Sequence, residues 1–422
     1  MYYVNGSLIK NINETKLNQF LKDNNCIRSE GQRGQDIKFW LEDLINERKI
    51  NTEILNDFFF DELFYGKSNM MNIYKIKSCK NLIDEESWID GLSEAYSIDS
   101  INFNNIMSTG VNPDAPEKIA AFRTSFDEER KVTSVKMILV KFIRVLVNGK
   151  EGDSCCYLAI DFNLEKKLLI IKVRNRHYIP RKEHRPKASI EKVVNTLKWE
   201  MDFETKLFDD EHQKVLYKMS TGLLEELYQS IPHYNDVHNM KDHIEVFIEE
   251  TIKNIQINNI IRYPDGKTEI NSGVIDLKDE LNKVLQQLIV SDYFLNEDID
   301  IFSRNNVSAA ITSIKFNDKE KNTAKLAGEN NTKAIVCSRT FMSMRKSIEV
   351  VETVSALSIA YKRTTDSIEV KFDASEKEYL CITILNRKYY DELDFKKIWG
   401  IYSRYESRAF DKNTKLCEEN VG

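Results

Sequence analysis

The chain has 422 residues, of which 41% are hydrophobic, 30% charged and 10% aromatic, so it can fold into two or three domains and does not resemble a disordered chain. Its 61 basic and 67 acidic residues give a net charge of −6, which argues against a protein whose whole surface coats nucleic acid or an anionic membrane. The 14 glycines and 6 prolines form no Walker-type or dinucleotide-binding fingerprint, and the seven cysteines are never spaced as Cys-x-x-Cys.

The apolar segments of the sequence resemble neither an export signal nor a membrane span. The first residues lack a basic region followed by an apolar core, and the most apolar stretch, residues 135–147, contains Lys136, Lys141 and Arg144. We therefore expect a cytoplasmic protein with reduced thiols, no membrane span and no cofactor.

Residues 1–112 predict a mainly helical N-terminal domain that follows a short first strand. Apolar residues recur at helical spacing within residues 17–21, 39–45 and 54–63. Asn51 or Thr52 is expected to cap the third of these helices, because Asn and Thr side chains accept hydrogen bonds from the first free N–H groups. Residues 71–76 are expected to form a strand.

Residues 113–186 predict a first β unit. Runs rich in Val, Ile, Phe and Thr are broken at residues 127–130, 148–152 and 163–166, and four antiparallel strands would satisfy these breaks. Cys155 and Cys156 fall within one of the strands, where adjacent side chains point to opposite faces, so at least one of them is structural.

A basic segment, residues 174–187, follows the last of these strands. It has a net charge of +5, from six cations against Glu183, and Tyr178 lies among the cations. Cations can contact phosphates while an aromatic ring stacks on a base, so we predict that the segment binds nucleic acid. The alternative is a solvated loop whose charges balance the acidic stretch at residues 200–211. The six cations are Arg174, Arg176, Arg181, Lys182, Arg185 and Lys187.

Residues 187–304 predict a helical region, and residues 305–422 a second β unit with a closing helix near residues 395–405. All six histidines lie between His177 and His243. A step of five residues, as between His233, His238 and His243, turns an α-helix by about 140°, so these side chains do not share a face. We expect no metal site.

The two β units resemble each other in sequence. Residues 165–178 align without gaps on residues 376–389, with seven of fourteen positions identical, and residues 120–133 align on residues 310–323. The fold class expected is therefore α+β, with two related antiparallel β units separated by a helical region and an insertion in the second unit. The repeat also places Arg387 and Lys388 opposite Arg176 and His177, so a two-sided basic clamp is conceivable.

These observations favour a non-enzymatic subunit that binds nucleic acid, DNA before RNA, with a protein partner or a second copy of itself. The abundance of Asn, Ile and Lys is typical of AT-rich bacteria, and phage defence or a mobile element is the setting we expect. One alternative is a scaffold subunit that uses Phe58, Phe59 and Phe60 at an interface. The other is a metal-dependent nuclease, because Glu369 and Lys371 share one face of a predicted strand.

Overall fold

The protein is described here from a computed structural model, in which the chain forms two compact units. Unit 1 comprises residues 1–212 and 370–404, and unit 2 comprises residues 213–369 and 405–422. No helix among the described residues is both long enough and apolar enough to cross a membrane. The structure describes residues 3–29, 34–78, 80–176, 178–254, 261–262, 268–270, 273–275, 277–295, 307, 309–317, 323–328, 335, 339–364, 366–386 and 388–418.

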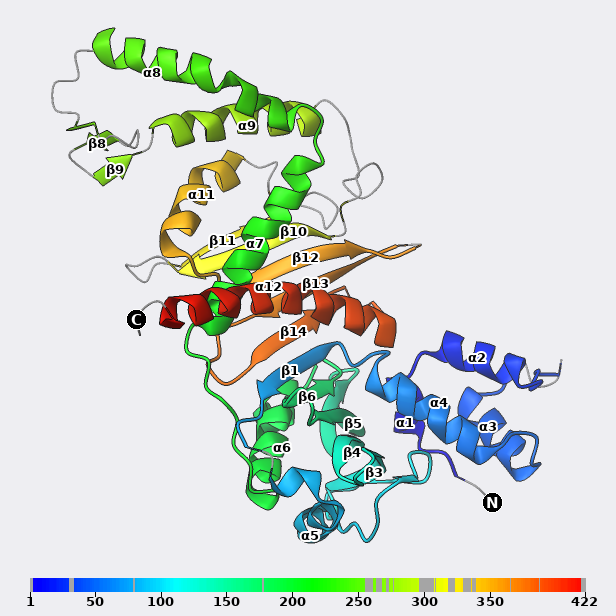
Figure 1. Ribbon diagram of the computed structural model, residues 1–422. Helices are drawn as coiled ribbons and strands as arrows, with labels where there is room; N and C mark the ends of the chain where they lie inside the picture. The colour runs from blue at the N-terminus through cyan, green and yellow to red at the C-terminus, as the bar shows by residue number, and fades with distance from the viewer. Residues whose placement is uncertain are drawn as a thin grey trace. The chain divides into compact units, whose positions relative to one another are not determined.

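Unit 1 is built around antiparallel strands in the order β13, β14, β1, β6, β5, β4, β3, β2 (Figure 1). Strand β13 belongs to this unit from Val370 onward. The strand bounds are β1 Met70–Lys75, β2 Phe103–Asn104, β3 Glu117–Phe126, β4 Val132–Val147, β5 Lys150–Asn163, β6 Leu168–Val173, β13 Ser367–Asp373 and β14 Leu380–Ile384.

Helices cover both faces of these strands, because strands β4 and β5 are apolar on both sides. Ile138 and Val140 of β4 pack with helices α1 to α4, whereas Met137 and Leu139 pack with α5 and α6. The result is a sheet between two helical layers. The helices of unit 1 are α1 Gly6–Asn11, α2 Glu14–Asp23, α3 Ile37–Asn46, α4 Thr52–Phe64, η2 Asn81–Ile83, α5 Glu85–Tyr96, η3 Lys182–His184, α6 Pro186–Glu200 and the first part of α12 Glu392–Glu418.

Strand β1 lies between two hairpins, β5–β6 and β13–β14. Both β6 and β14 are antiparallel to β1, so the two run in the same direction, and Met70 pairs with Val173 on one side and Thr383 on the other. Helix α6 follows β6 and helix α12 follows β14. They cover opposite faces of the sheet, because Ile171 of β6 packs with α6 whereas the next residue, Lys172, faces Phe395 of α12. Two copies related by a half turn about the direction of β1 would have this arrangement.

Unit 2 contains helices, a small three-stranded sheet in the order β7, β8, β9, and the strand order β11, β10, β12. Its bounds are α7 Glu211–Gln229, η4 Tyr234–Met240, α8 Lys241–Asn254, β7 Ile261–Arg262, β8 Thr268–Ile270, β9 Gly273–Ile275, α9 Leu277–Leu295, β10 Ala309–Asn317, β11 Thr323–Ala327, α11 Arg339–Val351 and β12 Ala356–Lys362.

The predicted α+β class is confirmed, with strands in two groups that helices separate. Asn51 caps α4 by accepting a hydrogen bond from Glu53 N at 2.7 Å, and the strand expected at residues 71–76 is β1. The short first strand is wrong: α1 begins at Gly6, because the Asn5 side chain accepts a hydrogen bond from Ser7 N and starts a helix there.

Candidate functional site

A cavity of about 580 Å³ lies in unit 1, where the segments that follow β6 and β14 come together. We call it the cationic cavity. Its lining includes residues of both copies of the sequence repeat. The lining residues are Lys10, Lys67, Asn69, Val145, Leu146, Val147, Asp153, Ser154, Arg174, Asn175, Arg176, Tyr178, Lys388 and Tyr389.

Asn69, directly before β1, joins the two repeat segments. Its side-chain oxygen accepts a hydrogen bond from Asn175 N at 2.8 Å, and its Nδ2 donates to Ile384 O at 3.2 Å. Its backbone carbonyl also accepts from Ile384 N at 2.8 Å. Because both hairpins flank β1, this one residue holds the chain leaving β6 and the chain leaving β14 at the same edge of the sheet.

Among the lining residues that the structure describes, five are cations and one, Asp153, is an acid. The Asp153 carboxylate lies 3.6 Å from the Arg144 guanidinium, a cation outside the lining, so the acid is already paired. Such an excess of positive charge inside a concave surface concentrates the field and attracts anions. The cavity is therefore suited to a ligand with negative charge.

The Lys10 carbonyl brings two of these cations close to each other. It accepts hydrogen bonds from Arg174 Nη1 at 2.6 Å and from Lys67 Nζ at 3.2 Å, near the C-terminal end of α1, where backbone carbonyls carry partial negative charge. Burial lowers the pKa of Lys67, and the positive charges of Arg174 and Arg176 lower it further. An anion bound beside Lys67 would relieve this repulsion.

Arg176 is held in place by protein contacts. Its guanidinium donates to Ser154 Oγ at 3.2 Å, to Asn11 Oδ1 at 2.5 Å and to the Cys155 carbonyl at 3.3 Å. The side chain therefore contributes a fixed positive charge to the wall, and part of its role is to connect α1 to β5.

The cavity also has an apolar and aromatic side. Leu146 N donates to the Tyr178 carbonyl at 3.0 Å, which brings the end of β4 beside Tyr178. The side chains are open to solvent, with exposed fractions of 67% for Tyr178, 41% for Leu146 and 55% for Val147. Exposed apolar side chains next to clustered cations are typical of a surface that binds an amphipathic ligand.

The structure divides the predicted nucleic-acid-binding residues into two sets. Arg174, Arg176, Tyr178 and Lys388 line the cavity. The other described members lie outside that lining. Those members are Arg181, Lys182, Arg185 and Lys187, and Arg387 lies outside the described residues.

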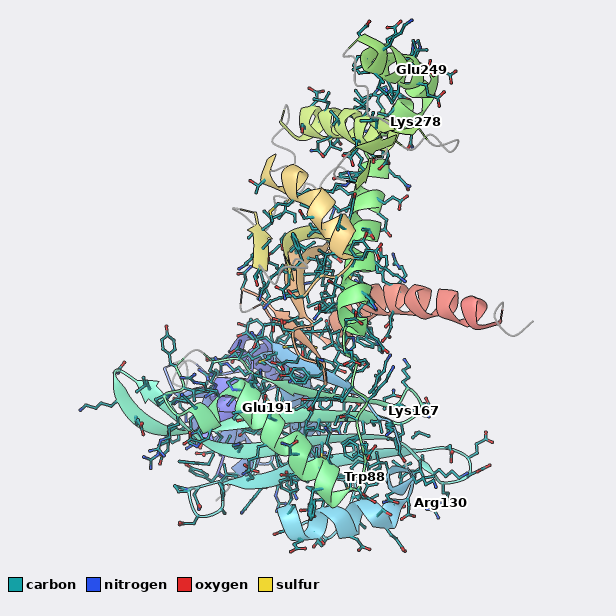
Figure 2. The ribbon with its side chains drawn as sticks, turned by 90° about the vertical axis from the view of Figure 1, so that its left-hand side faces the viewer. Trp88, Arg130, Lys167, Glu191, Glu249 and Lys278 are labelled. Atoms are coloured by element: carbon teal, nitrogen blue, oxygen red, sulfur yellow. The ribbon has the colours of Figure 1, made fainter. Side chains whose placement is uncertain are left out.

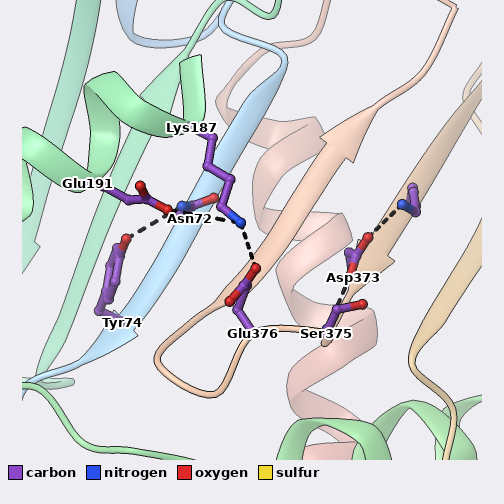
Figure 3. A network of polar contacts seen from close by, with 8 residues as sticks. Asn72, Tyr74, Lys187, Glu191, Asp373, Ser375 and Glu376 are labelled. Atoms are coloured by element: carbon purple, nitrogen blue, oxygen red, sulfur yellow. Dashed lines mark hydrogen bonds and ion pairs between the residues drawn. The ribbon is translucent and has the colours of Figure 1, made fainter. Parts of the chain in front are cut away.

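Two of the cations outside the cavity form ion pairs, although not with the acidic stretch at residues 200–211. Arg181 lies 3.2 Å from Glu151, and Lys187 lies 2.6 Å from Glu376 and 3.9 Å from Glu191 (Figure 3). The expected balance with residues 200–211 is therefore wrong for these two side chains.

Sequence reasoning missed Lys10, Lys67 and Asn69. They lie more than 100 residues before the basic segment, and each is an ordinary polar residue in its local sequence. The local signal nearest to Lys67 is Gly66, whose backbone has a φ of +35°, in the left-handed region that glycine tolerates best.

Replacing Gly66 with alanine is expected to lower the free energy of unfolding by about 1–3 kcal/mol. A Cβ atom there would lie 2.4 Å from the Glu62 carbonyl oxygen near the end of α4. The backbone at residue 66, next to Lys67, must therefore move to make room for it. Thermal unfolding of the two proteins measures the change. Gly110→Ala is the matched control, since nothing lies within 4 Å of its Cβ position. Equal losses in both variants would contradict the prediction.

The nuclease residues have partners of their own. Glu369 accepts a hydrogen bond from Thr312 Oγ1 at 2.8 Å, and Lys371 lies 2.6 Å from Asp373. Asp373 also accepts a hydrogen bond from Ser375 N (Figure 3). Among the described residues, no group of three or more His, Cys, Asp or Glu side chains could hold a metal ion.

The aromatic run proposed for a scaffold interface is part of the core instead. Phe59 and Phe60 are buried, and Phe58 stacks on Phe20 with 4.4 Å between ring centroids. That part of the scaffold hypothesis is wrong, because α4 turns these rings toward α2 and the sheet.

Comparison with known proteins does not assign this chain to a family. No protein-family description matches the sequence, and no curated protein matches it either. The function proposed below is therefore argued from the residues of the cavity.

Proposed function

We propose that this protein binds nucleic acid, DNA before RNA, through the cationic cavity, as a non-enzymatic subunit of a bacterial assembly such as one in phage defence. The observation that supports the proposal is the meeting of Arg174, Arg176 and Tyr178 with Lys388 and Tyr389 in one cavity. They come from both copies of the sequence repeat, and Tyr178 and Tyr389 occupy equivalent positions in it. Cations provide phosphate contacts and the two tyrosines provide stacking surfaces.

The charge-reversal variant Arg174→Glu with Lys388→Glu is expected to bind DNA at least tenfold more weakly than the natural protein. Each lost phosphate contact should also reduce the slope of log affinity against log salt by about 0.9 for a duplex or about 0.7 for a single strand. Fluorescence anisotropy with duplex DNA, single-stranded DNA and RNA, at low and moderate salt, measures both quantities.

Lys182→Glu with Arg185→Glu is the matched control, because it makes the same change of charge at two exposed residues outside the cavity lining. It should keep most of the affinity. Binding that both double variants weaken equally, or no salt-sensitive binding by the folded natural protein, would overturn the proposal. DNA cleavage with magnesium that is lost in Glu369→Ala and Lys371→Ala would favour the nuclease instead.

A scaffold function is the second candidate, supported by unit 2. Helices α8 and α9 pack against each other and expose large apolar side chains, Val246 and Phe247 on α8 and Val284 and Leu288 on α9. A protein interface of this kind would survive moderate salt, since apolar contacts are not screened, whereas phosphate contacts weaken steeply. The salt series above therefore separates the two candidates.

A further inference from the structure

The shape of the cationic cavity indicates which part of a nucleic acid it can receive. Proteins read a duplex by inserting a projecting helix or ribbon into its grooves. A cavity does the reverse, because it takes in a group that projects from the ligand. Its volume of about 580 Å³ falls among small-ligand sites, which span about 300–1,000 Å³. A strand end or a single nucleotide projects in this way, and the middle of a duplex does not.

The lining offers two kinds of contact that match the two halves of a nucleotide. Lys67 and Arg174 meet at the Lys10 carbonyl and form the cationic part. Tyr178, beside Leu146, forms the flat apolar part. A nucleotide has an anionic phosphate at one end and a flat base at the other, so one ligand can satisfy both.

The close spacing of the cations favours a terminal phosphate over a phosphate within the backbone. A terminal phosphate carries a charge of about −1.5 to −2 at neutral pH, whereas a phosphate within the backbone carries a single charge. Lys67 and Arg174 share the Lys10 carbonyl, at 3.2 and 2.6 Å, and burial together with the charges of Arg174 and Arg176 lowers the pKa of Lys67. A ligand with nearly two negative charges therefore gains more from this cluster than a backbone phosphate does.

We propose that the cationic cavity binds one nucleotide that carries a terminal phosphate, with the phosphate at Lys67 and Arg174 and the base against Tyr178. The inference rests on the proposed function and names the part of the nucleic acid that enters the site. The same chemistry is present at a phosphorylated strand end and in a free nucleoside monophosphate, so the experiment includes both sources.

The test compares single-stranded DNA oligonucleotides with a 5′-phosphate, a 3′-phosphate or hydroxyl ends, by fluorescence anisotropy on the full-length protein. At least one phosphorylated end should bind about tenfold more tightly, which corresponds to about one charge-assisted hydrogen bond. Deoxynucleoside monophosphate should displace the phosphorylated oligonucleotide at lower concentration than the nucleoside or inorganic phosphate does.

Three variants place the effect in the cavity. Lys67→Met should abolish the preference for the phosphorylated end, and Tyr178→Ala should weaken binding of the oligonucleotide and the monophosphate together. Tyr178 is exposed, so its replacement leaves the fold intact. Lys182→Met, at an exposed position of η3 outside the lining, should preserve the preference.

The outcomes separate this inference from the proposed function. Equal, salt-sensitive binding of all three oligonucleotides would overturn the terminal-phosphate site and leave nucleic-acid binding standing. Binding of monophosphate with no binding of any oligonucleotide would support the site, assign it to free nucleotide and overturn the proposed function. Binding of neither ligand would overturn both.

Discussion

Replacement of Lys172 with methionine is expected to make the protein more stable than the natural chain at and below neutral pH, by about 1–4 kcal/mol. Lys172 lies in β6 with an exposed fraction of 0%. Among the described residues, no hydrogen-bond partner reaches its Nζ, which faces the rings of Phe64, Tyr65 and Phe395 at 4.8, 4.0 and 4.3 Å. Methionine has a similar length and carries no charge to bury.

The pH dependence of this difference has a definite sign. Burial lowers the pKa of Lys172 from 10.5 to about 7, against a smaller opposing effect of the nearby Asp161 carboxylate. Between these two pH values the unfolded chain holds a proton that the folded chain lacks, so Lys172 makes stability rise with pH, by about 1.4 kcal/mol per unit. Below pH 7 both states are protonated and the cost of the buried charge is complete.

Urea unfolding of the natural protein and the Lys172→Met variant at several values between pH 6 and pH 10 checks this prediction. The variant's advantage should be largest at pH 6 and shrink as pH rises. In Lys172→Met the buried Asp161 carboxyl group loses a positive neighbour, which offsets part of the gain in stability. The double variant Lys172→Met with Asp161→Asn should therefore show the full gain. Parallel curves for the natural protein and both variants would contradict the prediction.

Trp88→Ala is expected to lower the free energy of unfolding by about 3–5 kcal/mol, the usual cost of deleting a large aromatic core side chain. Trp88 in α5, labelled in Figure 2, has an exposed fraction of 0%. Its ring meets Phe162 and Phe122 edge to face, with centroids 5.0 and 6.0 Å apart, and its Nε1 donates to the Leu82 carbonyl at 2.9 Å. The substitution removes both ring contacts and leaves a cavity between α5 and the sheet.

Trp199→Ala is the matched control, because that tryptophan in α6 has an exposed fraction of 83% and its loss should change stability by less than about 0.5 kcal/mol. Circular dichroism during urea unfolding measures both variants without depending on tryptophan fluorescence. Similar losses in the two variants would show that the α5 layer does not contribute as the structure indicates.

Local sequence patterns predicted the elements of this fold where short-range interactions decide them. The Asn51 cap, the strand at residues 71–76 and the strands between residues 118 and 178 depend on contacts within a few residues or on the alternation of apolar side chains. The pattern failed in the described residues 3–10, where a short strand was expected and the Asn5 cap starts a helix instead.

Some residues of the candidate cavity could be singled out from the sequence, for the same reason. The Arg174, Arg176 and Tyr178 cluster lies in one short segment, so its charge and aromatic content were visible without a fold. Arg181 and Lys187 belong to the same basic segment, and the sequence does not distinguish them from the cavity residues. In the structure they form ion pairs with Glu151 and Glu376 instead. Those partners are 30 and 189 residues away, and sequence spacing carries no information about such contacts.

By itself the sequence determined the α+β class, the repeat of residues 165–178 at residues 376–389, and the basic segment, because periodicity, internal similarity and charge are properties of neighbouring residues. Only the tertiary structure decided that β6 and β14 flank β1, so that both repeats end at one edge and share a cavity with Lys10 and Lys67. Strands β1 and β14 are more than 300 residues apart in the sequence. Their pairing depends on which side chains are buried and on the strand register, and both are set by the whole folded unit.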